Sequence, residues 1–180
     1  AGNGDITVKN DLGVEFSGAV TSGTVLVADT AANSAATFKA AVTSAITLGD
    51  GLNTDTNTLT LNCTTAGFSV TGTVAGTAGD TDNVAVSGGN TILTTAAWTA
   101  LDSVAVSGTD TILSAGASMT STAFTVGTGA TLRTSGAATL TGTINGAGTL
   151  DVDANTTVVG IIGGTTALTS VDIAAGTTLT

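Results

Sequence analysis

Residues Asn83–Leu93 read NVAVSGGNTIL, and residues Ser103–Leu113 read SVAVSGTDTIL. A third, degraded copy, AFTVGTGATL, ends at Leu132. The copies follow one another at an offset of about 20 residues, a period typical of solenoids, in which each repeat stacks on the last. Within each copy apolar residues alternate with polar ones, and glycine marks the turn, as expected for strand–turn–strand units.

The repeat continues beyond Arg133 in a shorter form, as GAATL, GAGTL and GTTL segments. We therefore predict a β-solenoid-like repeat region over residues 84–180. An antiparallel β-sandwich whose hairpins merely look alike is the alternative. The segment TTAAWTALD, between the first two copies, is expected to form a single helical turn that buries Trp98 and Leu101.

Residues 1–83 are predicted to form a separate β-rich module. The segments DITVKN, GVEFSGAV and GTVLVADT are expected strands, because apolar residues alternate or run continuously in them. A helix is predicted near residues 33–46, because the apolar positions recur there at helical spacing and two polar residues could cap its start. These residues are Ala35, Phe38, Val42 and Ala45, with Asn33 or Ser34 as the cap.

The composition supports a mainly β protein and excludes several classes of function. Charged residues make up 9% of the chain, and it has 25 Gly but no Pro, His or Tyr. Threonine and valine are abundant, and β-branched residues favour sheets. The net charge is −10, and Lys9, Lys39 and Arg133 are the only basic residues. A nucleic-acid partner is excluded because it requires a basic surface.

Membrane insertion is not expected either. The mean hydropathy is +0.48. Threonine, serine, asparagine and glycine nevertheless interrupt every apolar segment before it reaches the roughly 18 residues that a spanning helix needs. The hydropathy therefore comes from alanine and valine scattered along strands.

The sequence offers no catalytic system, and we expect no enzyme activity. Without histidine, Ser-His-Asp triads and the usual zinc sites are absent. Asp151 and Asp153 alternate on one strand face near Arg133, which we interpret as a solvated face rather than an acid–base pair. The single cysteine, Cys63, is expected to be buried; an intermolecular disulfide is the alternative.

No cofactor is expected, and calcium is the one candidate. The segment GDGLNTDTN offers four oxygen-bearing side chains in a single turn, Asp50, Asn53, Asp55 and Asn57. The nearby segment GDTDN adds Asp80 and Asp82. Their spacing does not match an EF-hand loop, and an ordinary Asx-turn explains the same residues.

The Gly-Thr-Leu and Val-x-Val-Ser-Gly segments resemble the β-solenoid passenger domains of autotransporters and related bacterial or archaeal surface-fibre and surface-layer proteins. Separately, residues 31–80 resemble a helix-then-hairpin module of phage-tail and bacterial surface proteins. Both resemblances imply an extracellular structural protein. The passenger domains are usually much longer than this chain.

The two ends of the chain suggest how such a protein assembles. Residues Ser170–Thr180, SVDIAAGTTLT, place Val171 and Ile173 on one strand face, followed by Leu179. Ile6 and Val8 alternate in the same way near the other end. With no polar cap at either end, we expect strand addition between copies to give a homopolymer, either a filament or a surface layer. An adhesin or binding module of a surface or phage-tail fibre is the alternative.

The expected location is the cell exterior. The segment AGNGD is typical of a mature end left after a signal peptide is removed.

Overall fold

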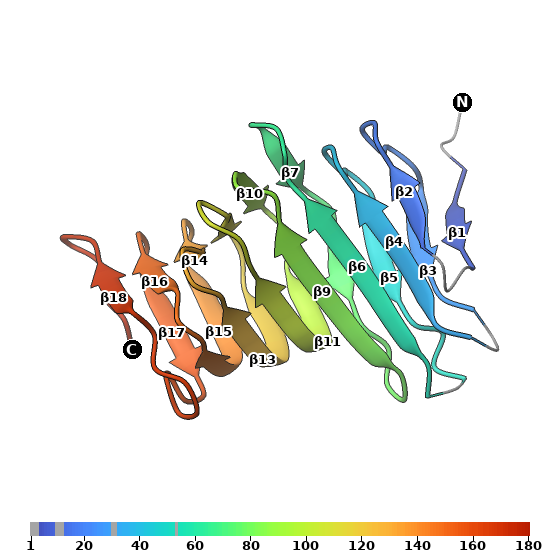
Figure 1. The fold of residues 1–180 in the computed structure, drawn as a ribbon. Coiled ribbons are helices and arrows are strands. Elements are labelled where there is room, and N and C mark those ends of the chain that lie inside the picture. Colours follow the sequence, from blue (N-terminus) through green and yellow to red (C-terminus); the bar gives the residue numbers. More distant parts are fainter. Residues whose placement is uncertain (1–3, 10–12, 30–31, 53) are drawn as a thin grey trace.

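The computed structural model describes residues 4–9, 13–29, 32–52 and 54–180. Throughout these residues the chain forms strands, turns and bends but no helix. Every strand pairing among them is parallel. The strands follow one another along a single axis in about eight turns, with the N- and C-terminal ends at opposite ends of the stack (Figure 1). The protein is a parallel β-solenoid.

Each turn contributes to three faces. The first face contains β1 (Ile6–Val8), β3 (Thr24–Val27), β5 (Ala45–Leu48), β8 (Val74–Ala75) and β17 (Thr156–Val159). The second face contains β2 (Val14–Phe16), β4 (Ser34–Phe38), β6 (Thr56–Asn62) and β9 (Thr81–Ser87). The third face contains β7 (Phe68–Val70), β10 (Thr91–Thr94), β12 (Ile112–Ala115), β14 (Thr131–Thr134), β16 (Thr149–Val152) and β18 (Ser170–Ile173).

Three long strands run around the corner between the first two faces. They are β11 (Trp98–Val106), β13 (Met119–Val126) and β15 (Ala138–Asn145). The start of β11 pairs with β8, and its end pairs with β9. In β15 the corner falls at Gly142, which has a φ of 134° and whose Cα lies against the carbonyl oxygen of Ser121 in the preceding turn. Glycine fits there because a side chain would meet that backbone oxygen.

The core consists of rows of inward side chains that pass from turn to turn in register. On the first face the row is Ile6, Val25, Ile46, Val74, Trp98, Met119, Leu140 and Val158. On the second face it is Val14, Ala36, Leu59, Val84, Val104, Phe124, Ile144 and Ile162. On the third face it is Phe68, Ile92, Leu113, Leu132, Leu150 and Val171.

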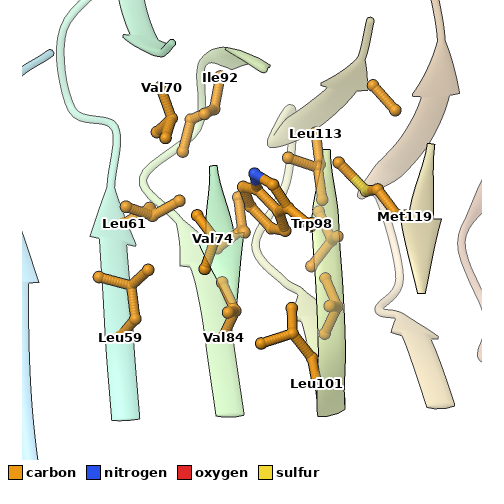
Figure 2. Packing of buried hydrophobic residues seen from close by; sticks show 14 of the residues in the cluster. Leu59, Leu61, Val70, Val74, Val84, Ile92, Trp98, Leu101, Leu113 and Met119 are labelled. Carbon is orange, nitrogen blue, oxygen red and sulfur yellow. The ribbon is translucent and has the colours of Figure 1, made fainter. Parts of the chain in front are cut away.

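Side chains from the three faces meet in the interior (Figure 2). Trp98 lies at the centre of this view, with its indole nitrogen directed towards Ile92, and it is fully buried. With aromatic residues making up only 3% of the chain, most of this core consists of Val, Leu and Ile. Such small aliphatic side chains suit the narrow interior of a solenoid, where each layer is one turn thick.

The helix predicted near residues 33–46 is wrong. The structure places β4 at Ser34–Phe38 and β5 at Ala45–Leu48 there, with Val42 bridging to Val20 and Val70 on the third face. Ala36 and Phe38 are buried at strand spacing. Phe38 and Val42 of the predicted helix face are buried, but Ala35 and Ala45 are not, and the strands bury Ala36 and Ile46 in their place. The parallel ladders on either side of each strand decide in favour of strand.

The helical turn expected around Trp98 is also wrong, although Trp98 and Leu101 are buried as expected. Both residues belong to β11.

The prediction of a mainly β chain with solenoid repeats is confirmed. The alternative β-sandwich is excluded for the described residues, because such sandwiches consist of antiparallel strands. The stack continues without interruption through β9, which spans the position where the repeat region was predicted to begin.

Candidate functional site

The last turn of the solenoid exposes apolar side chains that earlier turns bury. Val171 and Ile173 in β18 are 40% and 50% exposed, and Val159 and Ile161 are 54% and 61% exposed. Val171 stands in the same row as Leu150, which is fully buried one turn earlier. Val171 and Ile173 therefore form the open cross-section of the core, which we call the C-terminal surface. Val159 instead pairs with outward-facing Thr141, and Ile161 precedes the inward Ile162, so these two side chains point away from the core.

The backbone at this end is only partly paired. Residues 178–180 hydrogen-bond to β17, through Thr156 N–H to Thr178 O and Thr180 N–H to Thr156 O, both at 2.9 Å. Leu179 accordingly packs against the core and is half-buried. Among the described strands, β18 pairs with β16 alone, so one edge of β18 remains open.

The first turn presents a different surface. Val8 is buried and Ile6 is half-buried, because β3 already covers β1 on one side. The Phe16 ring stacks on Phe38 with centroids 4.7 Å apart and planes inclined by 8°. The edges of β1 and β2 that face away from β3 and β4 carry no partner strand among the described residues.

The structure thus separates the five residues that the sequence proposed for assembly. Val171 and Ile173 lie on the C-terminal surface, whereas Leu179 packs against the core beside Thr156 of β17, and Ile6 and Val8 belong to the opposite end. Sequence reasoning missed Val158 and Ile162, which are half-buried and end the rows of the first and second faces. The signal was present in the apolar run VVGII.

A polar corner lies where β6 and β9 begin, inside the turns that carry the calcium candidates. Asn57 Nδ2 donates to Asp82 Oδ1 at 3.1 Å, and the Thr77 N–H donates to Asp82 Oδ2 at 2.6 Å. Burial raises the pKa of the Asp82 carboxyl, and the carboxylates of Asp80 and Asp102 raise it further, partly offset by the two hydrogen bonds.

The four calcium candidates do not all converge there. Asp50 Oδ1 accepts from the Leu52 N–H at 2.9 Å, which is an Asx-turn, and Asn53 lies outside the described residues. Asn57 points to Asp82, as above. Within the described ranges, no three acidic, histidine or cysteine side chains are grouped to hold a metal ion.

The remaining polar candidates are engaged in local contacts. Arg133 Nε lies 2.8 Å from Asp151 Oδ2 and 3.4 Å from Asp153 Oδ2, so this charge cluster on the third face is neutralised in part by its own cation. Cys63 is buried and free, as predicted, and its thiol lies 3.3 Å from Thr65 O. Burial raises the pKa of that thiol, which leaves it unreactive.

One open groove lies along the corner between the first two faces, with a volume of about 550 Å³. It runs beside the loop that ends at Asp80, and it is lined mainly by small and hydroxyl side chains, including Thr120, Thr122 and Thr141. Asp102 adds a carboxylate. The groove contains no aromatic side chain and no basic one.

Among the described residues, no helix is long and apolar enough to cross a bilayer. Comparison with protein-family models, with curated proteins and with solved structures finds no match.

Proposed function

We propose that this chain is an extracellular structural subunit that assembles end to end with copies of itself into a filament or surface layer. The observation that carries the proposal is the C-terminal surface, where the rows of the core end in exposed Val171 and Ile173. A monomer leaves these side chains and the open edge of β18 in water, which is unfavourable for both.

The first turn of a second copy is a suitable partner for this surface. It offers strands on the same faces, with Ile6 and Val14 at the start of the rows that end in Val158 and Ile162. Stacking would extend the parallel ladders and cover the exposed aliphatic side chains together. Because the two surfaces differ, the contact is head to tail and gives an open polymer.

The exposed apolar side chains make a limited contribution to such a contact. Each half-exposed aliphatic side chain gains about 1 kcal/mol on full burial, half of the usual value for complete transfer. The two such residues of the C-terminal surface, Val171 and Ile173, therefore contribute about 2 kcal/mol, which is less than the lowest estimates of the cost of association, about 4 kcal/mol. The backbone hydrogen bonds that form between the strands of the two copies then determine whether the contact is stable.

The setting proposed is the cell exterior. The low lysine content, abundant threonine and calculated pI of about 4.1 support this location. The partner is the chain itself.

Sedimentation velocity over a range of concentrations tests the proposal. The chain should form a series of longer species, and the double substitution Val171→Asp/Ile173→Asp should leave folded monomers. Leu93→Asp is the matched control, because Leu93 is also 40% exposed and lies on the third face but points sideways. A chain that remains monomeric at every concentration, or a double variant that still assembles, contradicts the proposal.

A binding module is the second candidate, and the groove favours it. Rows of threonine hydroxyls beside Asp80 and Asp102 suit a neutral, hydroxyl-rich ligand such as an oligosaccharide. A glycan array probed with the chain and with Thr120→Val/Thr141→Val tests this candidate. If the double variant binds glycans as the unmodified chain does, the groove is excluded as the glycan-binding site.

A further inference from the structure

Buried oxygen atoms without hydrogen-bond partners gather at the polar corner. The oxygens of this kind among the described side chains are Ser34 Oγ, Asp55 Oδ2, Asn57 Oδ1 and Asp80 Oδ1. All of them precede or begin strands of the second face in consecutive turns. Buried polar atoms are normally satisfied, so a group of orphaned acceptors points to a partner that the protein chain itself does not supply.

The strand register places the residues that carry these atoms at neighbouring positions. Ser34 pairs with Asn57, and Asn57 pairs with Asp82. Thr56 pairs with Thr81, so Asp55 and Asp80 occupy equivalent positions immediately before them. Neighbouring strands lie only about 4.8 Å apart, and the Thr81 N–H also donates to Asp55 O at 2.8 Å.

The Asp80 carboxylate reaches into the turn above its own. Its Oδ2 accepts from the backbone N–H groups of Asp50 and Gly51, at 2.9 and 3.0 Å. These residues belong to the loop that leads to Asp55.

Asn57 provides an observation that does not depend on the acidic residues. Its side chain is 1% exposed, and its Nδ2 donates to Asp82, which fixes the amide within the corner. Its Oδ1 nevertheless has no donor. An amide oxygen that is buried in this way and left unpaired destabilises the folded state.

The corner also lacks a compensating positive charge. Lys39 Nζ lies 2.8 Å from Glu15 Oε2, and Arg133 pairs with Asp151. The third basic residue, Lys9, follows β1 at the first turn. Neither ion pair involves an acidic residue of the polar corner.

We propose that Asp55 Oδ2, Asp80 Oδ1 and Asn57 Oδ1 bind one Ca²⁺ ion at this corner. Carboxylate and amide oxygens are the ligands that Ca²⁺ prefers, and its flexible coordination allows backbone carbonyls and water to complete the shell. Mg²⁺ fits less well because it requires near-ideal octahedral geometry and retains its water. The ion links two consecutive turns, since Asp55 and Asn57 belong to one and Asp80 to the next. This site does not depend on end-to-end assembly.

Equilibrium dialysis of the full chain against CaCl₂, after removal of metal with a chelator, tests the proposal. The chain should bind one Ca²⁺, and Ca²⁺ should raise the Tm more than Mg²⁺ does at the same concentration. Asp55→Asn and Asp80→Asn should each weaken binding by at least about tenfold, and the double variant should lose both binding and the Ca²⁺-dependent rise in Tm. Asp110→Asn is the matched control, because it removes one exposed charge at a position with a φ of 62° that asparagine tolerates.

The outcomes separate clearly. Asp55→Asn is decisive even if Asp80→Asn fails to fold, because Asp55 Oδ2 carries no hydrogen bond that the fold would lose. A chain that binds no Ca²⁺ at millimolar concentration overturns the proposal, and so does an Asp55→Asn variant that binds Ca²⁺ as tightly as Asp110→Asn does. In either case water satisfies the orphaned oxygens.

Discussion

Leu132→Ala should destabilise the protein far more than Leu93→Ala. Leu132 is fully buried in β14 and lies in register between Leu113 and Leu150, which are also fully buried. Leu93 belongs to the same face but points outward, with 40% of its surface exposed. Both substitutions remove the same side-chain atoms from a strand of the third face, but the Leu132 side chain points into the core and the Leu93 side chain points to solvent.

The size of the difference follows from the packing. Removing a buried leucine side chain costs about 2–5 kcal/mol, and the higher part of this range applies where neighbours cannot close the cavity. Here the neighbours above and below are fixed in strand ladders, so we expect about 3–4 kcal/mol for Leu132→Ala. A chain of this length loses about 2–4 °C of Tm per kcal/mol, which gives a decrease of about 10 °C. Leu93→Ala should cost under about 1 kcal/mol.

Guanidinium unfolding followed by fluorescence provides the assay, because Trp98 is the only tryptophan and is fully buried. Circular dichroism measured in parallel reports the strands of all turns. If the two variants lost equal free energy of unfolding, or if Leu93→Ala lost more, the result would refute the assignment of Leu132 as inward and Leu93 as outward on the third face.

Three further predictions follow from individual contacts. Gly142→Ala should destabilise the chain by more than about 2 kcal/mol, because of its positive φ and the nearby backbone oxygen. Gly18→Ala, with open space around it, should be neutral in the same thermal unfolding experiment. Lys39 lowers the pKa of Glu15, so this pair contributes stability above the unfolded pKa that is lost as the pH falls through the folded value. An NMR titration should show the Glu15 pKa rising in Lys39→Met, and an unchanged value would contradict the pairing. Cys63 should react with a thiol reagent only after denaturation, and rapid labelling of the native chain would show that the thiol is accessible.

The sequence allowed the class of fold to be predicted, but not how far the solenoid extends along the chain. The alternating pattern around Val84 and Val104 identifies strands, and the repeated offset identifies stacking. Near Phe38 the adjacent alanines allow a helical period to be traced through Ala35, whereas the strand buries Ala36. The decision there depends on the ladders with neighbouring turns, which no local pattern contains.

The candidate site shows the same limit. The exposure of Val171 depends on whether another turn follows in space, and Val8 is buried only because β3 lies against it. Asp55 and Asp80 are far apart in sequence, and their adjacency requires the register of β6 with β9. Composition could indicate oxygen ligands, but not which of them meet.

Electron cryomicroscopy of the assembled chain tests the central proposal most directly. We predict filaments in which the strand ladder continues across each subunit boundary at about 4.8 Å, with the first turn of one copy against β18 and residues 178–180 of the next. Side-by-side contacts through the faces of the solenoid, or single rods of about eight turns under all conditions, would contradict it.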